Sequence, residues 1–200
     1  MLLKNKVRIA LLATIAISTG FVAPMSANAA NSAPKGDLVI VRNSDLQTLD
    51  PLFPQNDSIF IQEQMYEPLF QNLQSGKGVS PLLAKSGTVG KDGLTWTIKL
   101  RTDVKFSDGT PMTSADVKFS IDRATAGAGW GFLNTAIATV STPSADTVVI
   151  NTKFPWAPLL ADLASFSNSI LKANYGGQTS ADFFKNPIAT GPFVLDHWTP

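Results

Sequence analysis

The stretch FSDGTPMTSADVKFSIDRA, residues 106–124, specifies a tight turn that leads directly into a capped helix. Asp108 and Gly109 form an Asp-Gly pair, which is typical of turns because glycine adopts positive φ without steric cost. Thr113 begins the helix, and Asp116 follows three residues later, at the spacing of a capping box. The stretch contains no pattern of a nucleophile, a metal cage or a phosphate loop, so these residues alone leave open why the joint between turn and helix is so closely specified.

The helix that this joint begins has one apolar face. Val117, Ile121 and Ala124 recur at helical spacing with Ser120 beside them, so they are expected to face the core. The remaining polar residues of the helix are expected to lie in water, and they are Lys118, Asp122 and Arg123.

The clearest strand precedes the joint, in the run LTWTIKL at residues 94–100. Apolar and polar residues alternate there with period two, which predicts a strand in a sheet with one face in water. The apolar face consists of Leu94, Trp96, Ile98 and Leu100.

The other predicted elements are shorter. The run at 38–41 in DLVIVRNS is almost continuously apolar, which favours a strand buried on both faces. A helix is predicted at 58–70, where Pro68 should end or distort its last turn. Two strands are predicted around the TPSAD turn within 136–153, then a short helix in APLLADLASF at 157–166 and a last strand at 193–196. Together these elements predict a mixed α+β fold with mainly antiparallel strands.

The first 29 residues have the pattern of a secretory signal peptide. Three basic residues stand at the start, an uncharged apolar run covers 9–22, and Ala27-Asn28-Ala29 forms an A-x-A cleavage site. We expect cleavage after Ala29. The alternative, an uncleaved membrane anchor, is disfavoured because a membrane span needs about twenty apolar residues.

Charge and cysteine content restrict the partners and the compartment. After removal of residues 1–29 the chain has 13 Lys and Arg against 15 Asp and Glu, a net charge of about −2, so nucleic acid is not an expected partner. The sequence contains no cysteine, so it forms no disulfide and offers no cysteine for a bacterial lipid anchor. We therefore expect a soluble protein of the periplasm.

Catalytic patterns are missing from the sequence. There is no cysteine thiol and no G-x-S-x-G nucleophile elbow, and the only histidine, His197, has no metal-ligand spacing around it. The glycines of GAGWG at 127–131 follow a predicted helix and lack the spacing of a nucleotide loop. Asp45 and Asp50 are interpreted as residues of a solvated loop, although one could face a cleft. Residue chemistry alone therefore indicates an exported binding module that needs no cofactor and no metal.

Residues 81–124, PLLAKSGTVGKDGLTWTIKLRTDVKFSDGTPMTSADVKFSIDRA, resemble the signature region of family 5 of the bacterial extracellular solute-binding proteins. Four shorter segments resemble other patterns of that family, and the resemblance spans about residues 37–200. These segments are LDP at 49–51, YEPLF at 66–70, DTVVINTKFPWAPLLADLA at 146–164 and ATGPFVLDHW at 189–198.

The resemblance implies the first lobe of a periplasmic binding protein of type II, with an inserted accessory subdomain of mostly antiparallel strands and helices. Lobe I would begin at 30–64, the accessory subdomain would occupy 65–154, and 155–200 would return to lobe I. Family members are more than twice as long as this chain, and their second lobe follows the point where it ends. The resemblance therefore implies half of a ligand cleft, and the 200-residue chain alone is expected to bind peptides weakly or not at all.

The function implied by the resemblance is that of a non-enzymatic, monomeric receptor. It would bind dipeptides or oligopeptides in the periplasm and deliver them to an ABC permease in the inner membrane. Other solutes of the family remain as alternatives, namely a nickel chelate, an opine or an oligosaccharide, and so do a secreted hydrolase and a structural β module. From their positions, the residues expected to face the ligand are Asn43, Ser44, Asp45, Gln47, Tyr66, Thr190 and Gly191.

Overall fold

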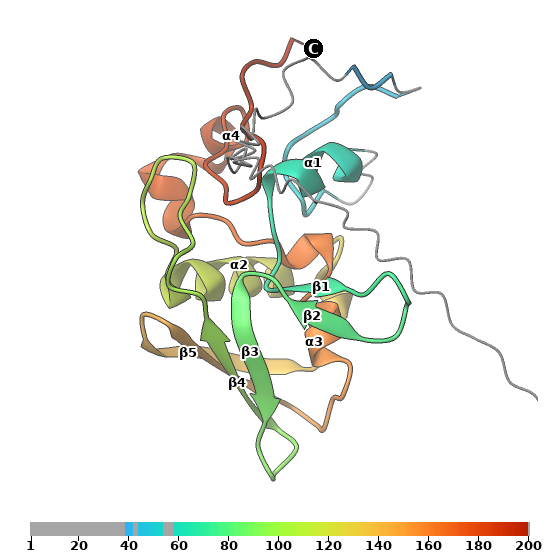
Figure 1. Ribbon diagram of the computed structural model, residues 1–200, viewed down its shortest axis with the longest axis vertical. Helices are drawn as coiled ribbons and strands as arrows, with labels where there is room; N and C mark the ends of the chain where they lie inside the picture. Colours follow the sequence, from blue (N-terminus) through green and yellow to red (C-terminus); the bar gives the residue numbers. More distant parts are fainter. Residues whose placement is uncertain (1–38, 42–43, 54–57, 200) are drawn as a thin grey trace, which may run out of the picture. The chain divides into compact units, whose positions relative to one another are not determined.

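The computed structural model describes residues 39–41, 44–53 and 58–199, and the chain divides into two units after Val41 (Figure 1). The predicted signal peptide lies outside these residues. The predicted strand at 38–41 is wrong for the part that is described, because residues 39–41 have no strand conformation and their side chains are 58–88% exposed. A strand needs hydrogen-bonded neighbours, and neither sheet of the described residues includes this run.

The larger unit is built on a four-stranded antiparallel sheet in the order β3-β4-β6-β5. Its strands are β3 (Ala84–Val89), β4 (Thr95–Leu100), β5 (Ile137–Ser144) and β6 (Thr147–Thr152). The alternation seen in the sequence is confirmed for β4, since Trp96, Ile98 and Leu100 are buried and Lys99 is exposed. The two strands predicted around the TPSAD turn are confirmed as β5 and β6.

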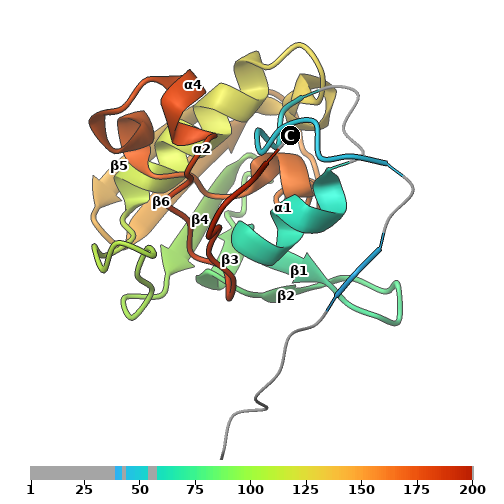
Figure 2. The same ribbon diagram turned by 90° about the horizontal axis from the view of Figure 1, so that it is seen from above.

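Helix α2 (Ser114–Ala126) packs on the apolar face of this sheet (Figure 2). Its predicted inner face is confirmed, because Val117, Ile121 and Ala124 are almost completely buried. They belong to a core that also contains Ile98 of β4 and Ile150 of β6. Burial of such apolar side chains contributes about 25 cal/mol per Å² and is the main stabilising force of this layer.

A second, smaller sheet pairs β1 (Phe70–Asn72) with β2 (Val79–Pro81). It connects to the larger sheet by hydrogen bonds from the backbone N–H groups of Leu82 and Ala84 to the carbonyl of Leu69. Gly87 of β3 lies opposite this junction, where a Cβ would stand 2.9 Å from both Phe70 and Leu160. A larger residue at 87 would require the ends of these two side chains to shift.

Helix α1 (Ile59–Met65) begins after Ser58 and ends earlier than predicted. Tyr66 has extended backbone, with φ −106° and ψ 144°, and Pro68 follows two residues later. Proline disfavours helical backbone in the residue before it and lacks an N–H to continue the helix, so this ending fits the sequence. Met65 at the end of α1 and Tyr66 after it belong to a second apolar cluster, which also contains Leu49, Leu171, Phe183, Phe184 and Ala189.

The carboxyl-terminal part of the described chain consists of short helices and extended segments. The helices are α3 (Leu159–Asp162), η2 (Phe166–Asn168), η3 (Ala173–Gly177) and α4 (Ser180–Phe183), and η1 (Gly131–Asn134) precedes them between α2 and β5. The predicted helix at 157–166 is therefore confirmed over only four residues. Leu159 and Leu163 are buried there.

The strand predicted at 193–196 is wrong, because these residues have no strand conformation. The backbone N–H groups of Gly191 and Phe193 instead donate to the carbonyls of Met65 and Gln64, at 2.8 and 3.2 Å. Carbonyls in the last turn of a helix have no partner within the helix. Residues 191–193 therefore cap the last turn of α1.

None of the helices in residues 44–53 and 58–199 combines the length and the apolarity that crossing a bilayer requires.

Candidate functional site

The predicted capping box at the start of α2 is present, and its carboxylate has an additional partner. The Asp116 carboxylate accepts hydrogen bonds from the N–H and the hydroxyl of Thr113, at 2.7 and 2.9 Å. Its other oxygen accepts the N–H of Ala173, 57 residues away, at 2.8 Å. Asp116 is buried, so one side chain caps the helix and also anchors the beginning of η3.

Asp116, Ser120 and Arg123 form a polar stripe on α2, because residues spaced by four and three share one helix face. The Ser120 hydroxyl accepts the N–H of Leu171 at 2.8 Å and donates to the carbonyl of Asp116 at 2.7 Å. The Arg123 side chain donates from Nε to the Tyr175 hydroxyl at 2.8 Å. All three residues of this stripe therefore bind the segment 171–175.

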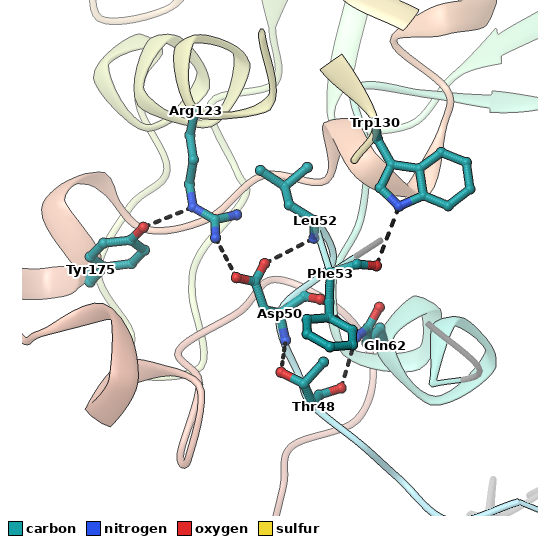
Figure 3. A network of polar contacts seen from close by, with 8 residues as sticks. All are labelled: Thr48, Asp50, Leu52, Phe53, Gln62, Arg123, Trp130 and Tyr175. Atoms are coloured by element: carbon teal, nitrogen blue, oxygen red, sulfur yellow. Dashed lines mark hydrogen bonds and ion pairs between the residues drawn. The ribbon is translucent and has the colours of Figure 1, made fainter. Parts of the chain in front are cut away.

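The expectation that Arg123 lies in water is wrong. Its guanidinium pairs with the Asp50 carboxylate at 2.5 Å, and the two side chains are only 17% and 24% exposed (Figure 3). The guanidinium also lies over the rings of Phe184 and Tyr175, at 5.1 and 5.8 Å from the ring centroids. Its helical spacing places Arg123 at the edge of the apolar face of α2. The side chain is buried because it pairs with Asp50, which lies 73 residues away in the sequence.

The loop that contains Asp50 is held by its own turn and by α1. The Asp50 carboxylate accepts the N–H of Leu52 at 2.9 Å, and the Asp50 N–H donates to the Thr48 hydroxyl at 3.1 Å. The Gln62 amide donates to the carbonyls of Thr48 and Asp50, at 2.9 and 3.1 Å. The LDP segment is therefore an ordered turn, and the expectation of a solvated loop is corrected for Asp50.

A pocket of about 460 Å³ lies against this turn, and we call it the Gln47–Trp198 pocket. Polar and aromatic side chains share its wall, as is usual for small-molecule sites. The residues that matter here are Gln47, Thr48, Asp50, Phe53, Phe184 and Trp198.

The structure separates the residues that were expected to face the ligand. Gln47 lines the Gln47–Trp198 pocket, and its N–H donates to the Ser58 hydroxyl at 3.0 Å. Ser44 and Asp45 precede Gln47 in the chain, and Ser44 is half-buried while Asp45 is exposed. Asn43 lies outside the described residues. Gly191 lies beside Tyr66, because the Gly191 N–H donates to the carbonyl of Met65, and neither residue lines the Gln47–Trp198 pocket.

Tyr66 is 1% exposed and lines a second pocket, of about 440 Å³, together with Glu63, Glu67, Phe166 and Pro192. Burial, with a smaller contribution from the Asp50 charge, raises the pKa of the Tyr66 hydroxyl above its ordinary value, and Arg123 opposes this. The hydroxyl has no hydrogen-bond partner within the described residues, and neither does the buried hydroxyl of Thr190. The side chain of Tyr66 is thus a core residue at the edge of a pocket.

The residues considered for catalysis do not assemble into a reaction centre. His197 is exposed, and its Nδ1 lies 2.9 Å from the carboxylate of Asp196. Trp130 of the GAGWG segment stacks edge-on against Phe166 and donates from Nε1 to the carbonyl of Phe53. In the described part of the chain, no three His, Cys, Asp or Glu side chains are grouped so that they could hold a metal ion.

The Asp108-Gly109 turn connects to two distant segments. Gly109 has φ +82°, as predicted for this turn. The N–H of Ser107 donates to the carbonyl of Ala189 at 2.8 Å, and the Asp108 carboxylate pairs with Lys172. The turn therefore joins α2 in holding the chain around residues 171–173, and it also holds residue 189.

We expect the Asp108–Lys172 pair to make stability depend on pH in acid. Hydrogen bonds from Lys172, and then from Thr110, lower the pKa of the Asp108 carboxyl from 3.8 to about 2. A carboxyl with a lowered folded pKa stabilises the fold fully above its unfolded pKa of 3.8, and this contribution is lost as pH falls through about 2.

Asp108→Asn should therefore flatten the dependence of unfolding free energy on pH between about 4 and 2, relative to the wild-type protein. Urea unfolding at a series of pH values measures it. Lys172→Met should flatten the pH dependence of the unfolding free energy over the same interval. The double variant should show little further change beyond either single variant. Parallel curves for wild type and Asp108→Asn would contradict this prediction.

Sequence comparison places the chain among exported binding proteins. The family described as bacterial extracellular solute-binding proteins, family 5 Middle, matches residues 78–200. The glutathione-binding protein GsiB of Shigella dysenteriae serotype 1 is 32% identical over 187 residues, which cover 91% of this chain and 36% of GsiB. GsiB of Escherichia coli strain K12 is 31% identical with the same coverage. The chain thus spans about a third of the length of these curated relatives.

Structural comparison gives the same proportion. Agropinic acid-bound AgaA of A. tumefaciens R10 has a TM-score of 0.70 and 30% identity over 78% of this chain and 32% of AgaA. NikA of Brucella suis in complex with Fe(III)-EDTA has a TM-score of 0.68 and 33% identity, and the match covers 78% of this chain and 32% of NikA. DppA of Helicobacter pylori in complex with the peptide STSA has a TM-score of 0.66 and 25% identity, and the match covers 78% of this chain and 35% of DppA. The predicted fold class, a first-lobe portion of a periplasmic binding protein, is confirmed.

Proposed function

The chain belongs to family 5 of the bacterial extracellular solute-binding proteins, and from this premise we propose that it is a periplasmic peptide receptor of an ABC importer. In this role the protein binds a dipeptide or oligopeptide and delivers it to the permease without changing it. The family match over residues 78–200 carries the proposal of a binding protein. Its relatives are transport-associated binding proteins, which supports a function without catalysis.

A peptide ligand has support from two relatives. One is named a glutathione-binding protein, and glutathione is a tripeptide. Another, DppA of Helicobacter pylori, has a structure in complex with the peptide STSA. The mixed polar and aromatic wall of the Gln47–Trp198 pocket supports this as well, because it can contact both the backbone and the side chains of a short peptide.

We propose the turn at 44–50 as the ligand-facing edge of this lobe, with Ser44, Asp45 and Gln47 as contacts, together with Asn43. Gln47 already lines the pocket, which supports its assignment. For Tyr66, Thr190 and Gly191 the proposed role is indirect. They lie where α1 meets the segment 189–193, and in the proposed role they hold that segment against α1.

Thermal unfolding with a panel of ligands tests the peptide proposal on the protein at its natural length. The panel contains alanyl-alanine, a mixed-sequence tetrapeptide, glutathione, agropinic acid and a nickel–histidine complex. A ligand at about 100 times its Kd stabilises the folded state by about 2.7 kcal/mol, which raises Tm by several degrees. We expect the peptides to raise Tm. If only the opine or only the nickel complex raises Tm, the ligand is of that class and not a peptide. If no compound raises Tm, the proposal is overturned.

A further inference from the structure

One guanidinium joins three segments that are distant in sequence. Arg123 of α2 pairs with Asp50 of the LDP turn and donates to the hydroxyl of Tyr175 in η3 (Figure 3). The guanidinium also lies over the ring of Phe184, after α4. The Arg123 and Asp50 side chains are largely removed from water. An ion pair in such a place is screened far less than an exposed one, so its geometry constrains its neighbours strongly.

The partners of Arg123 are parts of the Gln47–Trp198 pocket. Asp50 and Phe184 both line it. Tyr175 does not line the pocket but supports Phe184 from behind, with ring centroids 5.8 Å apart, and it packs edge-on against Phe119 of α2 at 5.0 Å. The position of Arg123 therefore affects two walls of the same pocket.

The backbone at Tyr175 would not hold its conformation by local preference. Asn174 and Tyr175 have φ of +51° and +54°, in the left-handed region that disfavours residues other than glycine. Such backbone persists only where surrounding contacts determine it. For Tyr175 these contacts are the hydrogen bond from Arg123 and the rings of Phe119, Phe183 and Phe184.

We propose that Arg123 is a positioning residue of the ligand-facing surface: it fixes the Asp50 turn against Tyr175 and Phe184 and so sets the width of the Gln47–Trp198 pocket. The proposal rests on the proposed function only in taking this pocket as ligand-facing. The guanidinium suits the task because its planar fork of donors serves a carboxylate and a hydroxyl at once while its face lies on a ring.

The test compares variants of Arg123 with a matched control on the same helix. Arg123→Met keeps the length and the apolar contact with Phe184 but removes both polar contacts. Arg123→Lys keeps a charge for Asp50 without the fork. Lys118→Met is the control, because Lys118 pairs with Asp122 on the exposed side of α2.

Two measurements are made on the protein at its natural length, namely amide hydrogen exchange without ligand and the Kd for alanyl-alanine and a tetrapeptide. We expect Arg123→Met to speed exchange at residues 47–52 and 173–184 about tenfold and to weaken peptide binding about tenfold. Arg123→Lys should recover part of the affinity, and Lys118→Met should change neither quantity.

The outcomes separate this inference from the function. If Arg123→Met speeds exchange but leaves the peptide Kd unchanged, Arg123 is structural only and the positioning role is overturned. If exchange at 47–52 does not change, the role is overturned whether or not peptides bind. If the wild-type protein binds no peptide, the proposed function fails, while exchange in Arg123→Met still decides whether this residue fixes the pocket wall.

Discussion

Asp116→Ala is expected to lower the free energy of unfolding by about 2 to 3 kcal/mol. The carboxylate accepts two hydrogen bonds from Thr113 at the start of α2 and one from the N–H of Ala173. Loss of a helix cap costs about 1 kcal/mol, and a backbone N–H left without its partner costs about 1 to 3 kcal/mol more. The better helix propensity of alanine returns about half a kcal/mol.

Asp122→Ala is the matched control for this prediction. Asp122 lies on the same helix, six residues later, and makes an exposed pair with Lys118. Such an i, i+4 pair contributes about 0.3 to 0.5 kcal/mol, which the helix propensity of alanine offsets. Urea unfolding of both variants measures the difference. Equal stabilities for Asp116→Ala and Asp122→Ala would show that neither the helix cap at Thr113 nor the bond to Ala173 contributes to stability.

The signature region acts on chain segments far from it. Four of its residues, Ser107, Asp108, Asp116 and Ser120, bind backbone or side-chain groups of residues 171–173 and 189. This explains why a stretch without catalytic residues is so closely specified. Each of these four residues has a partner that lies more than fifty positions away in the sequence. The joint aligns the short helices that carry the walls of the Gln47–Trp198 pocket.

The parts of the fold that were predictable from sequence are those determined by local periodicity and local hydrogen bonds. The alternation in 94–100, the apolar spacing of 117–124 and the Thr113 cap each have their structural cause within a few residues. The run at 38–41 and the one at 193–196 also have high strand propensity, but a strand requires neighbours that propensity does not specify. Residues 193–196 pair with no strand, and the N–H of Phe193 donates to the carbonyl of Gln64 in α1.

The candidate site was less predictable, because its contacts join residues that are 51 to 73 positions apart. The network of Asp50, Arg123 and Tyr175 was missed for this reason. One signal was present in the sequence: Asp116, Ser120 and Arg123 follow each other at spacings of four and three, which places three polar residues on one helix face beside the apolar one. A polar stripe next to the core predicts a polar partner segment, although it does not identify that segment.

Gly191→Ala is expected to lower the free energy of unfolding by about 3 kcal/mol. A Cβ at residue 191 would stand 2.4 Å from the carbonyl oxygen of Met65 and 2.8 Å from that of Gln64, which are backbone atoms of α1. The clash cannot be relieved by a rotamer change, so the segment 189–193 must move away from the helix. Overpacking of this kind costs about 1 to 3 kcal/mol. The displaced segment also loses its two hydrogen bonds to α1, each contributing about 1 kcal/mol.

Gly109→Ala is the matched control, because it separates this steric clash from the preference of glycine for backbone with positive φ. Gly109 has φ +82°, and a Cβ at this residue would meet no other atom within 4 Å. Alanine there meets only the left-handed backbone penalty, about 1 kcal/mol. Chemical unfolding of both variants, with amide exchange at residues 64–66, gives the comparison.

A Gly191→Ala protein as stable as Gly109→Ala would mean that the close approach to α1 does not hold the segment 189–193. A large loss of stability with faster exchange at Met65 would instead establish that Gly191 acts through α1. The reason is that a residue that only contacts ligand cannot stabilise the protein when no ligand is present.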